Sequence, residues 1–175
     1  ESRGLGDVYK RQKNTGGTLV EKCCHFFDLM RFIVKSEPIS VYASGGQDVN
    51  HLDEEYDGKK PDIIDNAYVI VNFENGSRSM LELCMFAENS EMQEELTATG
   101  NIGKIETSVP SNESGKTTSD VRIGMRDGKT KQESVSVDPK ILEAGHHHGS
   151  TYYEHLAFIN ACLLYTSDAA DDQLG

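Results

Sequence analysis

The sequence predicts an α+β fold in which helices cover one face of an open, mainly antiparallel β-sheet. Three features indicate this class. A segment with helical periodicity comes first, a series of short segments with alternating polarity follows, and a second helical segment comes near the end. Two of the links between the short segments contain Asn-Gly or Asp-Gly, which are typical of tight turns between antiparallel strands.

The first helix is predicted over residues 18–35. Apolar side chains recur along it at steps of four, three, four and three, which places them on one stripe: Leu19, Cys23, Phe26, Met30 and Ile33. Glu21, His25 and Asp28 fall on a different, polar face. The helix is expected to end before Pro38, because the residue that precedes a proline avoids the helical backbone region.

Strands are predicted in seven segments bounded by Gly, Asn, Asp or Ser. They cover residues 39–43, 62–73, 79–86, 95–100, 104–109, 120–125 and 133–137. The second and third are the strongest, and Asn75-Gly76 between them predicts a hairpin. A second helix is predicted over residues 151–161.

Residues 47–60 interrupt the strand series with a charged stretch that includes Asp53, Glu54 and Glu55. We interpret this stretch as a solvated loop. Calcium binding is the alternative, although the ligand spacing of an EF-hand is absent.

The chain of 175 residues carries 17 basic and 29 acidic side chains, a formal net charge of −12. This balance argues against nucleic-acid partners, which are held mainly by Lys and Arg, and against an anionic membrane surface. The sequence has no run of about 18 apolar residues and no signal-peptide pattern. We therefore expect a cytoplasmic protein of one domain or slightly more.

The cysteines form no Cys-x-x-Cys pair; they are Cys23, Cys24, Cys84 and Cys162. A disulfide framework or zinc ribbon is not expected. We expect reduced and mostly buried thiols.

The two ends of the chain do not continue the periodicity of their neighbours. Residues 1–12 and 162–175 resemble translated adapter sequence, so both are predicted to be non-native. Residues 13–161 are then the folded part, which is expected to be a fragment of a longer protein.

Glu21 and His25 are the candidate acid–base pair. Residues four apart are neighbours on a helix, and a carboxylate there fixes the imidazole tautomer and stabilises the imidazolium, as removal of a hydroxyl proton requires. An alternative is open, because residues 18–21 have the spacing of a capping box. In that case Glu21 turns back to the amide of Thr18 and His25 has no partner.

Residues 16–33, GGTLVEKCCHFFDLMRFI, resemble the first helix of the C-terminal domain in the Gfo/Idh/MocA family of NAD(P)-dependent oxidoreductases. The family signature is a glycine pair, an acid, a histidine four residues later and an aspartate three further on. Gly16-Gly17, Glu21, His25 and Asp28 match it in order. Residues 145–161, GHHHGSTYYEHLAFINA, resemble the segment that leads into the family's last helix, so the resemblance covers residues 13–161.

The resemblance implies a parent enzyme that transfers hydride between a sugar or polyol hydroxyl carbon and NAD or NADP. It implies His25 as the acid/base, Glu21 as its support, and His148 and Tyr152 as substrate-binding residues. It also implies a homo-oligomer that pairs through the sheet face, with the fragment as the substrate and oligomerisation domain. Tyr152 as a plain packing aromatic is the alternative.

Two departures from the family pattern are visible. Glu21 stands where aspartate is common, and no Gly-x-Gly-x-x-Gly phosphate turn is present. The chain alone is therefore not expected to bind a dinucleotide or to catalyse a reaction. A second histidine cluster, His146 to His148 with His155, matches no known zinc spacing, so no metal site is predicted.

Two other functions stay open at this point. One is a glycosidase of the same family that oxidises its substrate transiently with bound NAD. The other is a non-catalytic binding or assembly module built on the sheet.

Overall fold

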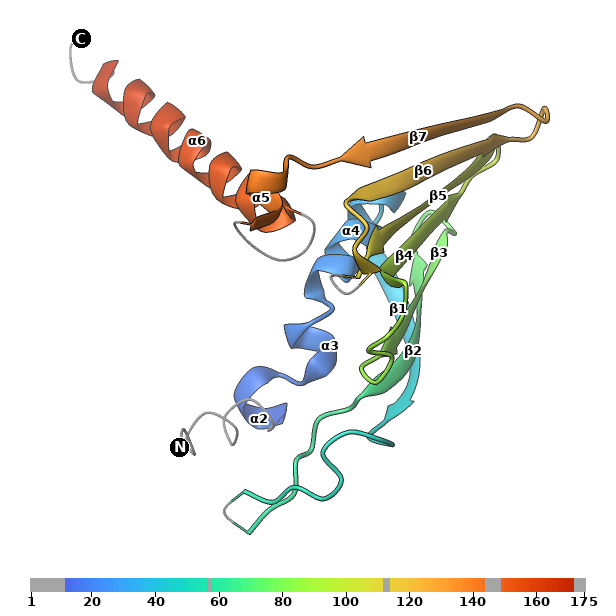
Figure 1. The fold of residues 1–175 in the computed structure, drawn as a ribbon, viewed down its shortest axis with the longest axis vertical. Helices are drawn as coiled ribbons and strands as arrows, with labels where there is room; N and C mark the ends of the chain where they lie inside the picture. Colours follow the sequence, from blue (N-terminus) through green and yellow to red (C-terminus); the bar gives the residue numbers. More distant parts are fainter. Residues whose placement is uncertain (1–11, 57, 112–113, 144–148, 172–175) are drawn as a thin grey trace. The chain divides into compact units, whose positions relative to one another are not determined.

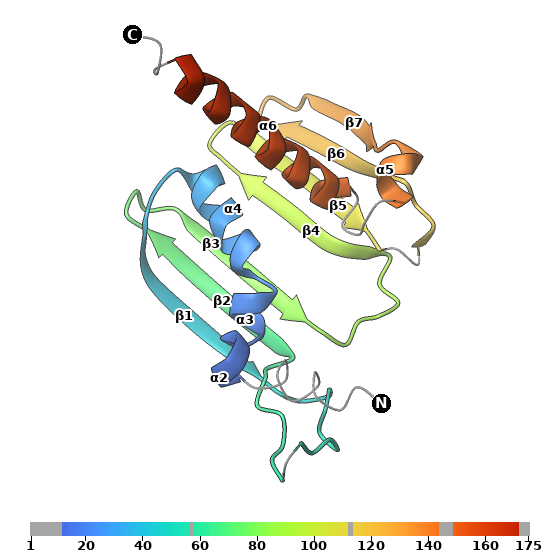
Figure 2. The ribbon, with the colours of Figure 1, turned by 90° about the vertical axis from the view of Figure 1, so that its left-hand side faces the viewer.

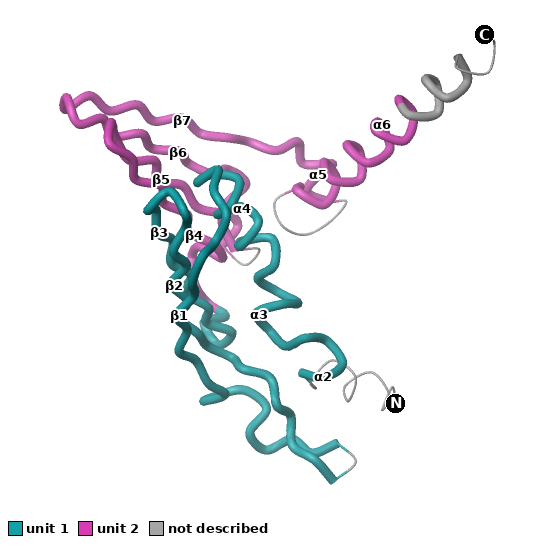
Figure 3. The backbone as a smooth tube through the Cα atoms, turned by 180° about the vertical axis from the view of Figure 1, so that it is seen from behind, with its two compact units in different colours: residues 1–88 teal, residues 89–175 magenta. Residues whose placement is uncertain are grey.

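The structure, a computed structural model, describes residues 12–56, 58–111, 114–143 and 149–171 (Figure 1). The chain divides into two compact units, Glu1–Glu88 and Asn89–Gly175 (Figure 3). Each unit has its own antiparallel sheet. The predicted α+β class is confirmed, with the strands divided between two sheets.

The described residues of the first unit form three helices and a three-stranded sheet. The helices are α2 (Gln12–Thr15), α3 (Thr18–Glu21) and α4 (Cys24–Val34), and the strands are β1 (Pro38–Gly46), β2 (Asn66–Phe73) and β3 (Arg78–Cys84). The strand order is β1-β2-β3, and both pairings are antiparallel. Figure 2 shows α3 and α4 lying across one face of this sheet, as the sequence predicted.

The core of the first unit lies between the helices and the sheet. Alternate residues of β2 are buried, together with Leu81 of β3 and Cys23. The β2 residues are Ala67, Val69, Val71 and Phe73. Each large apolar side chain removed from water contributes about 1.5–3 kcal/mol. This burial makes β2 the centre of the unit.

The predicted first helix is broken in the structure. Lys22 and Cys23 form a turn between α3 and α4, and Cys23 has φ −114° and ψ −1°, at the edge of the helical region. The turn carries Cys23 into the core. Burial of Cys23 agrees with the apolar stripe, whereas the turn does not follow from it. Val34 packs against the core, and Ile33, which was expected there, is 41% exposed.

The hairpin predicted at Asn75-Gly76 is confirmed. Gly76 has φ +82°, its N–H donates to the carbonyl of Phe73 at 2.9 Å, and the N–H of Phe73 donates to the carbonyl of Ser77 at 3.0 Å. A positive φ is the conformation for which glycine is the preferred residue.

In the second unit, the part of the chain that the structure describes has four strands and two helices. They are β4 (Met92–Thr99), β5 (Gly103–Pro110), β6 (Thr118–Met125), β7 (Thr130–Ser136), α5 (Pro139–Glu143) and α6 (Ser150–Asp171). The strand order is β4-β5-β6-β7, and every pairing is antiparallel. The last helix continues ten residues beyond its predicted end at Ala161, through Asp171.

No helix among the described residues has both the length and the apolar character that crossing a membrane requires.

Candidate functional site

The candidate site is built on the short segment that runs from α2 to the start of α4. Gly16 and Gly17 connect α2 to α3 with φ values of +82° and +85°. Residues with a side chain rarely adopt this backbone conformation, so glycine is preferred at both positions of the turn. The N–H of Gly16 donates to the carbonyl of Gln12 at 2.7 Å, which closes α2.

Thr18 is the first residue of α3, and it is buried. Its hydroxyl donates a hydrogen bond of 2.5 Å to the carbonyl of Ile64. The N-cap is Gly17, without a side-chain cap. The capping-box interpretation is therefore wrong, because Thr18 lies inside the helix and its hydroxyl bonds to the segment before β2.

Glu21 is the last residue of α3 and His25 is the second residue of α4, so they do not stand one turn apart on a continuous helix. The Glu21 carboxylate lies 3.5 Å from Lys22 Nζ. The His25 side chain is exposed in the first turn of α4, with its ring centroid 4.0 Å from that of Phe26. In the part of the chain that the structure describes, no hydrogen bond or ion pair joins Glu21 to His25.

A small hollow lies beside the two glycines. It has a volume of about 70 Å³, and its lining includes Gln12, Gly16, Gly17, Thr18 and Ile64. This space suits a few water molecules rather than a sugar ring. Neither Glu21 nor His25 is among its lining residues.

The other two predicted site residues, His148 and Tyr152, belong to the sequence of the second unit. Tyr152 belongs to α6 of the second unit, where its ring packs edge-on against Tyr153 with centroids 5.5 Å apart. His148 lies outside the described residues. The substrate-binding roles of both remain predictions.

The expectation of mostly buried cysteines is wrong. Only Cys23 is buried, whereas Cys24, Cys84 and Cys162 are exposed. Burial, and to a smaller extent the neighbouring Cys24, raise the pKa of the Cys23 thiol. Cys23 is thus a core residue rather than a nucleophile.

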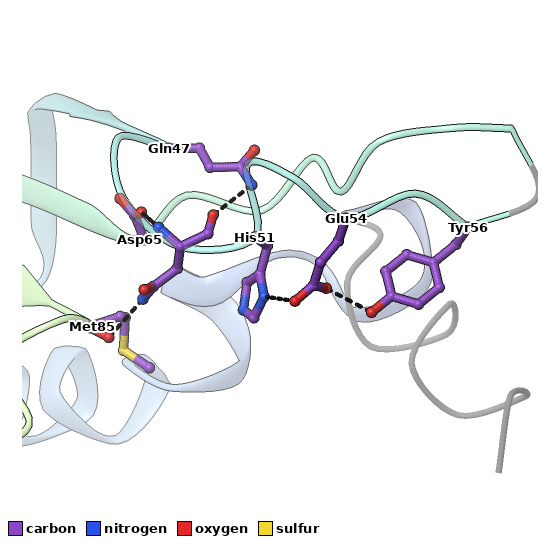
Figure 4. Close-up of polar contacts among 7 residues, drawn as sticks. Gln47, His51, Glu54, Tyr56, Asp65 and Met85 are labelled. Carbon is purple, nitrogen blue, oxygen red and sulfur yellow. Dashed lines mark hydrogen bonds and ion pairs between the residues drawn. The ribbon is translucent and has the colours of Figure 1, made fainter. Parts of the chain in front are cut away.

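Sequence reasoning missed Asp65, a buried acidic residue directly before β2 (Figure 4). Its oxygens accept the backbone N–H groups of Asp48 at 3.0 Å, Val49 at 2.8 Å and Asn50 at 2.7 Å. The side chain of Asn66 adds a fourth donor at 2.9 Å. Burial alone raises the pKa of Asp65, but these hydrogen bonds outweigh it and lower the pKa to about 2.

A signal for Asp65 was present in the sequence. It lies two residues before Ala67, in phase with the buried positions of β2. A charged residue in a buried phase requires hydrogen-bond partners, which here come from the loop that follows β1.

The loop between β1 and β2 carries a further polar group of side chains (Figure 4). His51 Nδ1 lies 2.9 Å from Glu54 Oε1, and the Tyr56 hydroxyl donates to Glu54 Oε2 at 2.6 Å. The Asn50 side chain donates to the carbonyl of Met85 at 2.7 Å, which ties the loop to the end of β3. Across the described residues, no group of three His, Cys, Asp or Glu side chains is placed to hold a metal ion.

Comparison with known proteins gives a match to one family model. Residues 7–172 match the model described as "Oxidoreductase family, C-terminal alpha/beta domain". No curated protein matches the chain.

Solved structures share the fold at low sequence identity. An aldose–aldose oxidoreductase from Caulobacter crescentus, solved with glycerol, has a TM-score of 0.56 and 16% identity over 90% of this chain and 41% of that one. A provisionally assigned oxidoreductase from Thermotoga maritima has a TM-score of 0.53 and 18% identity over 85% of this chain and 39% of that one.

A protein from Desulfitobacterium hafniense, provisionally described as an NADPH-dependent oxidoreductase, has a TM-score of 0.51 and 15% identity over 75% of this chain and 38% of that one. The chain therefore spans about two fifths of the length of these structures.

Proposed function

Because the chain belongs to the Gfo/Idh/MocA oxidoreductase family, as a C-terminal α/β domain, we propose that its parent protein transfers hydride between a sugar or polyol and NAD or NADP. The chain supplies the substrate and oligomerisation domain of that enzyme, and His25 is its acid/base. The aldose substrate named for the Caulobacter crescentus relative supports a sugar as the ligand.

The observation that carries the proposal is the exposure of the His25 imidazole on a helix that is otherwise fastened to the sheet. Phe26, Phe27 and Met30 of α4 pack against the core, while His25 faces solvent in the first turn. An accessible imidazole on a rigid support is suited to proton exchange near neutral pH.

In the oxidative direction, the hydroxyl proton of the substrate passes to a ring nitrogen of His25. A nicotinamide held outside this chain would accept the hydride, so that the alcohol carbon would become a carbonyl carbon with loss of one hydride and one proton. The negative charge of Glu21 stabilises the imidazolium that results. The Glu21–Lys22 ion pair is exposed and 3.5 Å long, and such pairs contribute about 0–1 kcal/mol, so Lys22 competes weakly for this carboxylate.

The residues of this chain do not fit a dinucleotide. The described strand pairings are all antiparallel, and the sequence has no Gly-x-Gly-x-x-Gly, whereas a dinucleotide site needs a parallel βαβ unit with that turn. We assign NAD(P) binding to parts of the parent protein outside this chain. His148 and Tyr152 are proposed to contact sugar hydroxyls on the family resemblance alone.

The test measures turnover of the parent protein with aldoses and polyols, each with NAD⁺ or NADP⁺. Turnover is monitored as formation of the reduced nicotinamide. His25→Asn is expected to lower kcat by about 10²–10⁴-fold, the usual contribution of an acid/base residue. His51→Asn is the matched control, because it also removes an imidazole of this unit and asparagine tolerates the positive φ of 62° at that position.

Two results would contradict the proposal. One is a His25→Asn variant with the activity of the unchanged protein. The other is hydrolysis of glycosides without net formation of reduced nicotinamide, which would indicate the glycosidase chemistry instead.

A further inference from the structure

We propose that Thr18 is a positioning residue, whose hydroxyl bond to Ile64 fixes α3 and thereby the placement of Glu21 relative to His25. The inference rests on the proposed role of His25 as the acid/base. It concerns a residue that touches neither substrate nor cofactor in that proposal.

The hydroxyl bond joins parts of the first unit that are far apart in sequence. Thr18 is 7% exposed, and its Oγ1 donates to the Ile64 carbonyl at 2.5 Å across 46 residues. A second bond runs beside it, from the N–H of Gln12 to Asp62 Oδ1 at 2.7 Å. The segment that carries the glycine pair and α3 is thus fastened to residues 62–64 at two points.

The acceptor of the Thr18 bond is itself held in place. Asp65, the next residue after Ile64, donates its N–H to the carbonyl of Gly46 at 2.9 Å and accepts the N–H of Met85 at 2.8 Å. Its carboxylate accepts the three loop amides described above. The Ile64 carbonyl is therefore held firmly, and a hydrogen bond to it fixes α3 relative to the sheet.

α3 needs such an anchor because it is a single turn. It covers only Thr18–Glu21, and a helix of one turn is unstable in water without outside contacts. On its far side the chain enters the core at Cys23, which fixes the start of α4 and hence His25. Glu21 lies between the two anchors, so the polar one at Thr18 decides where its carboxylate stands relative to the imidazole.

Loss of the hydroxyl bond is expected to affect the reaction more than substrate binding. Misplacement of a catalytic group by about 1 Å can cost about 10²-fold in rate. Thr18→Val keeps the shape of the side chain and removes the hydroxyl, whereas Thr18→Ser keeps the hydroxyl. We expect Thr18→Val to lower kcat of the parent protein by about tenfold or more with little change in KM, and Thr18→Ser to restore it.

Thr97→Val is the matched control, because Thr97 is an exposed residue of β4 and the change removes a hydroxyl of the same kind. The second measurement is the NMR spectrum of histidine-labelled protein, in which the His25 ring signals should move in Thr18→Val and stay in Thr18→Ser. Should Thr18→Val fail to fold, Thr18→Ala takes its place in both measurements.

The outcomes separate the two proposals. Unchanged kcat and unchanged His25 signals in Thr18→Val, or equal impairment in Thr18→Ser, would overturn the positioning role. Full activity of His25→Asn would overturn the proposed function instead, and the NMR comparison would still report whether Thr18 sets the placement of Glu21 relative to His25.

Discussion

At the scale of single residues, Asp65 shows how a buried charge is compensated. Asp65 is 3% exposed, and the backbone N–H groups of three consecutive residues donate to its carboxylate. Because hydrogen bonds to the charged form outweigh burial, the pKa falls from 3.8 to about 2. The folded state therefore stabilises the ionised form of Asp65 more than the unfolded state does.

This difference predicts how stability depends on pH. Since the folded pKa is lower than the unfolded value, the contribution of Asp65 is fully present above about pH 5 and is lost as the pH falls to about 2. We expect about 2 kcal/mol of unfolding free energy to depend on this group. Urea unfolding at several pH values, compared between the unchanged chain and Asp65→Asn, measures it.

The control for this prediction is Asp53→Asn, which removes an exposed carboxylate of the same loop. It should leave the pH dependence unchanged. An Asp65→Asn variant that loses stability between pH 5 and pH 2 as steeply as the unchanged chain would show that the amide cluster does not stabilise the charge.

Whether the role of a single residue could be predicted from the sequence depends on how far along the chain its contacts lie. The exposure of Glu21 and His25 was predicted correctly. Their placement on one helical face was not, because the chain turns at Lys22 and Cys23 between α3 and α4. The roles of Thr18 and Asp65 were not predicted. Thr18 bonds to a residue 46 positions away, and Asp65 bonds to amides 15 to 17 positions away, so neither contact follows from local spacing.

At the scale of elements, the glycine pair decides how α3 begins. Gly17 has φ +85°, and a Cβ there would lie 3.1 Å from the Gln12 side chain. We expect Gly17→Ala to lower the unfolding free energy by about 1–2 kcal/mol, the cost of an L-residue in the left-handed region. Thermal or urea unfolding measures this.

Gly124→Ala is the comparison for that change. Gly124 lies in β6 without a positive φ, and a Cβ there would meet no atom within 4 Å. The unfolding free energy of the Gly124→Ala variant should stay within about 0.5 kcal/mol of that of the unchanged chain. Equal effects of the two substitutions would mean that the backbone conformation at Gly17 does not require glycine.

The elements themselves were predictable where one face of a strand is buried. Alternation located β2 and β3, and the Asn-Gly turn between them fixed the hairpin. The prediction placed residues 62–65 in β2, but the strand begins at Asn66. Before it, the carbonyl of Ile64 accepts the hydroxyl of Thr18, and the N–H of Asp65 donates to the carbonyl of Gly46. These bonds take the place of a continuous strand pairing. The helix break at Lys22 and Cys23 was not predicted, because the apolar periodicity continues across it.

At the scale of the whole molecule, the first unit leaves an apolar row on the sheet face opposite its helices. Tyr42 pairs with Ile70, and Ile70 pairs with Met80, so the three side chains share one face. They are 69%, 39% and 65% exposed. Exposed apolar side chains grouped in this way are typical of protein–protein contacts. This row is therefore where we propose that copies of the parent protein pair.

Tyr42→Glu tests that proposal, because a charge in the middle of an apolar interface must be desolvated when two copies meet. We expect the dimer dissociation constant of the parent protein to rise by about tenfold or more, as for central aromatic residues of interfaces. Val41→Glu is the matched control, since Val41 is the adjacent residue, is 62% exposed, and shares the opposite face with Val71. Sedimentation or light scattering over a range of concentrations measures both. A parent protein that stays monomeric, or a Val41→Glu change that weakens association as much, would contradict pairing through this face.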